Sequence, residues 1–82
     1  MDKMIIAAFP ASAIKICVQS GETDQIIAQT MFWMPEFEDK FKEGLNSYAI
    51  EEIYVVGPKD YISRFVDIIN GITDIPVIEE VM

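Results

Sequence analysis

Hydrophobic and polar residues alternate along the segment AIKICVQ, residues 13–19. Its side chains divide between two sides of an extended chain, with Ile14, Ile16 and Val18 on one and Lys15, Cys17 and Gln19 on the other. A period of two predicts a strand with one buried face. The apolar run KMIIAAF, residues 3–9, precedes it across a short link, so we expect a β-hairpin. The turn-rich SGETD then leads into QIIAQTMFW, residues 25–33, as a third strand.

Apolar residues recur at helical spacing in the segment that follows Pro35. They lie at i, i+4, i+8 and i+11 and form one stripe: Phe37, Phe41, Leu45 and Tyr48. Proline suits the first position of a helix, and the acidic residues that come next suit its positive end. The pattern predicts a first helix that opens at Pro35.

A second helical pattern opens at Pro58, which suits the first helical position, and Asn70-Gly71 is typical of its C-terminal stop. Its inner face is marked by Ile62, Phe65, Val66 and Ile69. We expect the two helices to pack through Phe41, Leu45, Phe65 and Ile69.

Two further strands flank this second helix. The segment EEIYVVG, residues 51–57, has a continuous apolar run from Ile53 to Val56, which predicts a strand covered on both faces. The segment IPVIEEV, residues 75–81, is expected to return parallel to it by a right-handed crossover. The order β-β-β-α-β-α-β predicts an α/β fold with a five-stranded mixed sheet and two helices. Its first strand is central, and residues 1–82 form one domain.

Two stretches of the chain carry a family resemblance. Residues 4–29, MIIAAFPASAIKICVQSGETDQIIAQ, are similar to the first hairpin of actin-like ATPases, where Asp-x-Gly-(Thr/Ser) follows the first strand. Residues 50–77, IEEIYVVGPKDYISRFVDIINGITDIPV, are similar to the strand–Gly–helix–strand unit near the adenosine site of that group. With the order of elements, they make the chain resemble the ribonuclease H-like core, which implies that fold. The same topology also arises without common ancestry.

The chain departs from that family at the positions that carry its chemistry. The family's aspartate, which holds a metal or a metal-bound water near phosphate, corresponds to about Phe9, and its glycine to about Ala11. Ribonuclease H-like nucleases also use acids on the first and fourth strands, whereas here only Glu51 and Glu52 stand at the start of the fourth. A divalent site needs several converging oxygens. The resemblance therefore implies a fold without inherited catalysis, and a degenerate phosphoryl-transfer enzyme is the least favoured function.

Residue usage points the same way. The chain has no His, so metal sites reduce to carboxylates, and Cys17, its only cysteine, lacks a histidine base. We predict no catalytic residue, no metal site and no cofactor, and the balance of the sequence is against an enzyme.

Charge and hydropathy restrict the partners. Hydrophobic residues make up 51% of the 82 residues, so we expect part of the apolar surface to be buried between subunits of a homo-oligomer. The net charge is −8, of which residues 36–82 carry −7. Such a surface disfavours direct nucleic-acid binding and suits a basic protein partner, mimicry of nucleic acid, or solubility alone. No apolar run approaches the ~20 residues of a membrane span, and no signal peptide is evident, which predicts a cytoplasmic protein without membrane contact.

The best ligand candidate is the turn Gly57-Pro58-Lys59-Asp60. Free N–H groups at a helix start attract anions, and Lys59 adds a positive charge. However, Pro58 lacks one N–H group and Asp60 already occupies the positive end. We predict that the turn mainly starts the helix. Gly57 and Lys59 remain the ligand-binding residues of the alternative.

Two other segments are candidate protein-binding surfaces. The densest cluster of large side chains is Met31, Phe32, Trp33 and Met34, which suits an interface or a core equally. The outer side of the first helix carries an acidic set that suits a docking surface for a basic partner or a plain solvated face: Glu36, Glu38, Asp39 and Glu43.

The sequence therefore supports two functions from different classes. The first is a non-enzymatic protein that binds another protein, as a homodimer. A small acidic chain without a catalytic constellation is typical of phage or mobile-element accessory proteins and inhibitors. The alternative is a nucleotide or short-oligonucleotide binder that uses the helix start at Gly57–Lys59.

Overall fold

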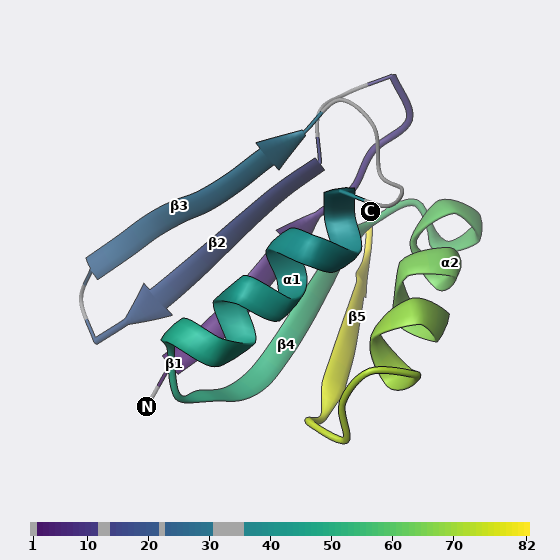
Figure 1. Cartoon of the computed structure of the whole chain (residues 1–82). Helices are drawn as coiled ribbons and strands as arrows, with labels where there is room; N and C mark the ends of the chain where they lie inside the picture. The colour runs from purple at the N-terminus through teal and green to yellow at the C-terminus, as the bar shows by residue number, and fades with distance from the viewer. Residues whose placement is uncertain (1, 12–13, 22, 31–35) are drawn as a thin grey trace.

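The central strand of the sheet is β1 (Asp2–Ala7), as the sequence predicts. The structure, a computed structural model, describes residues 2–11, 14–21, 23–30 and 36–82, with the backbone alone for residues 25–30. Along the chain follow β2 (Ile14–Ser20), β3 (Thr23–Thr30), α1 (Glu36–Ser47), β4 (Ile50–Gly57), α2 (Lys59–Asn70) and β5 (Val77–Val81) (Figure 1). The order across the five-stranded sheet is β3-β2-β1-β4-β5. The predicted mixed sheet with two helices is confirmed.

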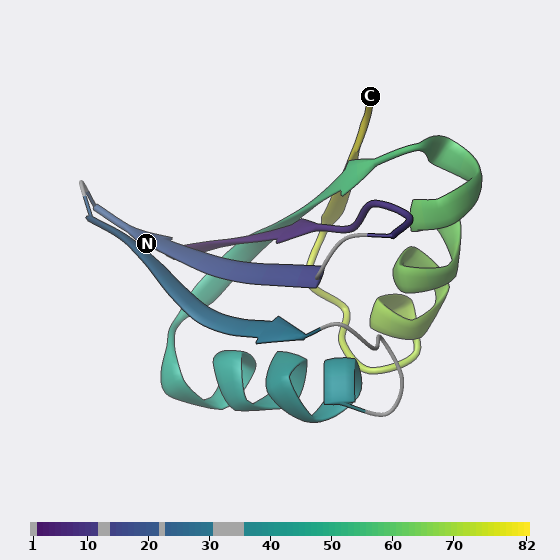
Figure 2. The ribbon, with the colours of Figure 1, turned by 90° about the horizontal axis from the view of Figure 1, so that it is seen from above.

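Strand β2 alone runs opposite to the others, because it pairs antiparallel with both β1 and β3. The pairs β1–β4 and β4–β5 are parallel. The two helices therefore belong to two parallel crossovers, β3-α1-β4 and β4-α2-β5, and both crossovers advance toward the β5 edge. Right-handed crossovers that advance in the same direction place their helices on the same face of a sheet. Figure 2 shows α1 and α2 on one side of the sheet.

The core lies between that face and the two helices. The register aligns Met4 with Val18 and Ile53, and it aligns Ile6 with Ile16 and Val55 in the next row. All six side chains are at most 1% exposed. Helix α1 packs on β2 and β3, and α2 on β4 and β5.

Aromatic rings join the two helices over the core. The ring of Phe37 in α1 meets that of Phe65 in α2 edge-on, with 5.0 Å between centroids, and stacks on Phe41 at 5.9 Å. The predicted packing residues Phe41, Phe65 and Ile69 are fully buried, and Leu45 packs against the core from its margin. The predicted helix-packing residues are confirmed.

The prediction that β4 is covered on both faces is wrong. Ile53 and Val55 are buried under the helices, but Tyr54 and Val56 point to the opposite face and are only half-buried. Among the described elements none covers that opposite face, because both crossovers put their helices on the same side. The continuous apolar run of β4 therefore needs another explanation than burial within this layer.

Helix boundaries differ slightly from the sequence patterns. Pro35 lies outside the described residues, and α1 is described from Glu36. Pro58 is the N-cap of α2 rather than its first helical residue, with extended backbone at φ −63° and ψ 137°. The predicted stop at Asn70-Gly71 is confirmed: the Gly71 N–H donates to the carbonyls of Asp67 and Ile68.

Candidate functional site

The turn between β4 and α2 is closely packed against β1. A Cβ on Gly57 would overlap with the carbonyl oxygen of Ala8 and would come within 2.7 Å of Ile62 Cγ2. Gly57 also has φ +155°, a conformation that side chains rarely adopt. The glycine is thus required by close approach of the protein's own backbone, without any ligand.

The helix start next to Gly57 also uses its own polar groups. The carbonyl of Pro58 accepts hydrogen bonds from the N–H groups of Tyr61 (3.0 Å) and Ile62 (2.9 Å). Lys59 is exposed and Asp60 lies in the first turn of α2. Neither Gly57 nor Lys59 lines either of the two hollows described below. The ligand role of these two residues stays a prediction.

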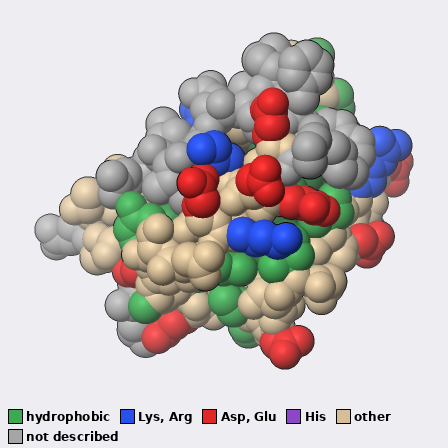
Figure 3. Space-filling view, in the orientation of Figure 1, with side chains coloured by type: hydrophobic (Ala, Val, Ile, Leu, Met, Phe, Trp, Pro, Cys, Tyr) green, Lys and Arg blue, Asp and Glu red, His purple; other side chains and the backbone are tan. Residues whose placement is uncertain are grey.

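The acidic residues of α1 lie on its outer side, with Glu36, Asp39 and Glu43 exposed and Glu38 half-buried. Figure 3, which views the helix side of the molecule, shows acidic side chains spread over this face with basic ones between them. The Lys40 ammonium is 3.1 Å from Glu43 Oε2. Three of the four acidic residues of α1 lie in its first turn, and a docking role for this surface stays a prediction.

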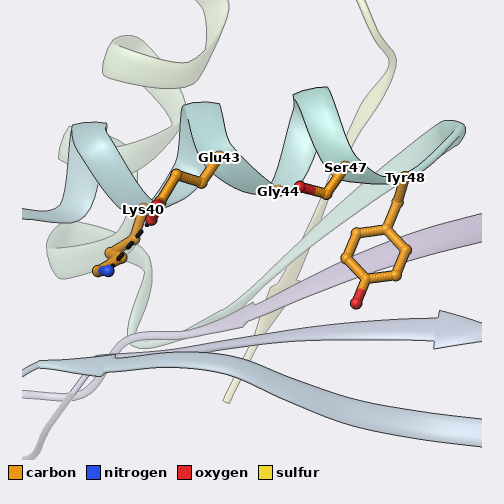
Figure 4. Close-up of a pocket in the computed structure, with 5 residues that line it drawn as sticks. All are labelled: Lys40, Glu43, Gly44, Ser47 and Tyr48. Carbon is orange, nitrogen blue, oxygen red and sulfur yellow. Dashed lines mark ion pairs between the residues drawn. The ribbon is translucent and has the colours of Figure 1, made fainter.

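A hollow of about 260 Å³ lies beside the C-terminal half of α1. It is lined by Lys40, Glu43, Gly44, Ser47 and Tyr48. Figure 4 shows Lys40 and Tyr48 extending from α1 at opposite ends of the hollow, with Gly44 between them. Small-molecule sites are usually larger, roughly 300–1,000 Å³, and mostly apolar, whereas this lining is mostly polar. It has the character of a surface groove.

The predicted interface at Met31, Phe32, Trp33 and Met34 lies outside the described residues. It stays a prediction.

The face of the sheet that the helices leave uncovered, here called the open face, brings together twelve described residues of five strands. They are Asp24 of β3, Lys15, Cys17 and Gln19 of β2, Lys3, Ile5 and Ala7 of β1, Glu52, Tyr54 and Val56 of β4, and Ile78 and Glu80 of β5. Each alternates along its strand with a residue that points toward the helices. The assembly of this surface follows from strand register alone.

The middle of the open face is an apolar row that runs across four of these strands. The register places Cys17, Ile5, Tyr54 and Ile78 side by side, and this set is here called the central row. All four side chains are half-buried, although no described element lies over them. Each of these side chains therefore keeps part of its surface accessible to solvent.

A polar cluster borders the central row. Lys3 Nζ lies 3.9 Å from Glu52 Oε1 and 5.7 Å from the centroid of the Tyr54 ring. The Tyr54 hydroxyl donates a hydrogen bond of 3.4 Å to Glu52 Oε2. The Lys3 and Glu52 side chains are 47% and 39% exposed, so water screens the ion pair and its stabilisation is small. The cluster fixes the orientation of Tyr54 at the centre of the face.

A shallow hollow of about 220 Å³ lies on the open face. It is lined by Lys3, Ile5, Gln19, Tyr54, Val56 and Glu80. This volume is also below the usual range for small-molecule sites, roughly 300–1,000 Å³. The shape and the apolar floor suit side chains of another protein better than a free ligand.

Sequence reasoning missed the open face as a site. The signal was present in the alternation of β2, where Lys15, Cys17 and Gln19 share one side. It was hidden in β1 and β4, because both of their faces are apolar near the middle. Only the handedness of the two crossovers decides which face stays uncovered.

Other kinds of site find no support among the described residues. No three His, Cys, Asp or Glu side chains come together there as metal ligands. No helix in that part of the chain is long and apolar enough to cross a bilayer. No model of a known protein family matches the chain, and no curated protein is significantly similar to it.

Proposed function

We propose that this protein is a non-enzymatic binding module that contacts another protein through the open face of its sheet. The observation that carries the proposal is the central row, four half-buried apolar side chains in line across β2, β1, β4 and β5 with no described element over them. Contiguous apolar surface rimmed by polar residues is typical of protein interaction sites.

The composition of the open face also supports a protein partner. Interfaces favour an apolar centre with a polar rim, and they are enriched in tyrosine. Here Tyr54 lies at the centre, and Lys15 and Glu80 lie to either side of it on β2 and β5. The hollow on this face is smaller than most small-molecule sites, which favours a protein partner.

The proposed setting is the cytoplasm, where a single unpaired cysteine, Cys17, stays reduced. An accessory or inhibitor role in a phage or mobile element fits a chain of this size and acidity. Binding of a basic partner, including by mimicry of nucleic acid, would use the acidic first turn of α1 as a second contact.

The nucleotide-binding alternative has less support. It would use Gly57 and Lys59, but the close contact of Gly57 with Ala8 and the hydrogen bonds to the Pro58 carbonyl already account for that turn. A nucleotide panel scored by thermal shift tests it, because a ligand at 100 times its Kd stabilises the protein by about 2.7 kcal/mol.

Native mass spectrometry of the protein purified from its own host tests the proposal. We expect the wild type to carry a protein partner, either a second copy or another chain. Tyr54→Arg should lose it, because a charge in the central row cannot be desolvated without cost. The matched control is Asp67→Arg, which adds the same side chain to an exposed position on α2.

Circular dichroism on both variants establishes that the fold is intact. A partner that survives in Tyr54→Arg and disappears in Asp67→Arg would place the docking surface on the helices. A wild type that carries no protein partner after cross-linking in its host contradicts the proposed function.

A further inference from the structure

Across the strands β2, β1, β4 and β5, the charged residues of the open face are arranged so that the face can complement a copy of itself. We propose, resting on the protein-binding function above, that its partner is a second copy of this chain. The two sheets pack face to face about a two-fold axis that runs along the strands between β1 and β4.

Charge across the open face is ordered by strand. Lys15 of β2 and Lys3 of β1 are basic, whereas Glu52 of β4 and Glu80 of β5 are acidic. A fifth charged residue of the face, Asp24, lies on β3, beyond β2 and outside these four strands. Across β2, β1, β4 and β5, the basic residues therefore lie on one side and the acidic residues on the other, although the protein as a whole carries −8.

The charged residues also lie at matching levels along the strands. Lys15 pairs with Ala7, Ala7 with Val56, and Val56 with Glu80, so Lys15 and Glu80 end the same row. Lys3 and Glu52 are direct neighbours in another row. In each row, the base and the acid are equally far from the line between β1 and β4.

A rotation of 180° about that line generates the partner. It places the β1–β2 side of one copy over the β4–β5 side of the other, and each residue keeps its position along the strand direction. Strand β1 then lies over the partner's β4, and β2 lies over the partner's β5. Lys15 faces the partner's Glu80, and Lys3 faces the partner's Glu52. Aligned packing of two sheets, with strands within about 30° of each other, is a common arrangement.

The same rotation matches the apolar residues. Ile5 lies over the partner's Tyr54, and Cys17 lies over the partner's Ile78. A two-fold axis across the strands would instead set Lys15 over the partner's Gln19 and Lys3 over the partner's Ala7, and it would leave every charge unmatched. The charge order therefore selects the axis along the strands, since like charges avoid each other and opposite charges fix the register of an interface.

The size of the face sets the expected affinity. Four strands spaced about 4.8 Å apart, each about six residues long, make a surface of roughly 400 Å². A standard interface buries about 800 Å² per partner, so this contact is about half the standard size and suits a weak, transient dimer. We expect a dissociation constant in the micromolar range, with orientation set by the four ion pairs and affinity by the central row.

Charge reversal tests the pairing. Sedimentation velocity from about 5 to 500 μM, around the expected Kd, should show a wild-type dimer. Lys15→Glu and Glu80→Lys should each weaken it about tenfold or more, because each creates two like-charge contacts per dimer. An equimolar mixture of the two variants should dimerise as the wild type does, because each base again faces an acid.

A matched control separates the pairing from a general charge effect. Lys42→Glu makes the same substitution at an exposed position of α1 and should leave the dimer unchanged. Cys17 gives a second readout, because it is the only cysteine and it lies in the central row. Its alkylation should slow as the wild-type concentration rises, and it should not slow in Lys15→Glu.

Three outcomes overturn the inference: a wild type that is monomeric throughout, single variants that dimerise like the wild type, or a mixture that stays monomeric. In the first case, a different protein held by the wild type and lost in Tyr54→Arg leaves the proposed function standing. In the second case, the dimer forms through another surface. Loss of a bound protein in Tyr54→Arg then still supports the proposed function, and retention of that protein contradicts it.

Discussion

The two faces of the sheet differ in how deeply their side chains are buried. On the covered face, Met4, Ile6 and Val55 are fully buried under α1 and α2. On the open face, Ile5, Tyr54 and the rest of the central row are apolar but only half-buried. Adjacent residues of the same strand therefore have similar side chains and different surroundings.

This difference teaches that apolar character and burial within one chain are separate properties. The covered face is apolar because two helices pack on it. The open face is apolar although nothing in the described chain packs on it, and exposed apolar surface of this kind is characteristic of a contact with another molecule. The open face carries basic residues on β1 and β2 and acidic residues on β4 and β5. From this order of charges we infer that the other molecule is a second copy of the chain.

The largest expected effect comes from crowding the covered side at Gly57. Gly57→Val should destabilise the protein by about 4 kcal/mol or more, since its Cβ would overlap with the backbone of Ala8. Gly71→Ala is the matched control, because Gly71 has ordinary helical φ and a Cβ there would lie 3.4 Å from the nearest atom, the Ile68 carbonyl oxygen. Urea denaturation of both variants measures the difference. Equal costs would mean that the turn is not packed as described.

A pair of adjacent isoleucines compares the two faces directly. Ile6→Ala should cost about 3 kcal/mol of unfolding free energy, the usual loss for a buried isoleucine. Ile5→Ala, one residue away on the open face, should cost about 1 kcal/mol because it is half-buried. Both are measured in urea at a concentration where the protein is monomeric. An Ile5→Ala loss as large as that of Ile6→Ala would show that the open face is covered within the chain.

The smallest expected effect is at Lys59, outside both faces. Lys59→Ala should change stability by less than ~0.5 kcal/mol, as surface substitutions usually do, and should leave partner binding intact. Thermal shift and native mass spectrometry provide the two measurements. Loss of a bound nucleotide in this variant, with the fold preserved, would favour the nucleotide-binding alternative over the open face.

Much of the fold follows from local patterns. The alternation in β2, the stripe from Phe37 to Tyr48 and the stop at Asn70-Gly71 predicted elements that the structure contains. Strand ends differ by a few residues, because strands end where pairing ends rather than where apolar residues do. The first helical position of α2 moved by one residue because Pro58 remains extended.

The candidate site was less accessible from the sequence. The sequence favours a structural turn at Gly57 and names this residue for a ligand only in the alternative function, and the structure gives the glycine a steric reason in Ala8. The apolar run Ile53–Val56 predicts a strand covered on both faces, whereas only one face is covered by helices. A local pattern cannot show how many layers surround a strand. Residues of the central row lie up to 73 positions apart, from Ile5 to Ile78, and only register joins them.

The sequence by itself determined the elements, their order and the buried side of β2, since these depend on periodicity and on turn residues near each other in the chain. The tertiary structure decided that both helices lie on one face, because two right-handed crossovers advance in the same direction from β3 to β5. That choice left Lys3, Tyr54 and Glu80 on an uncovered surface. Handedness and register are properties of the whole sheet, so no single segment carries them.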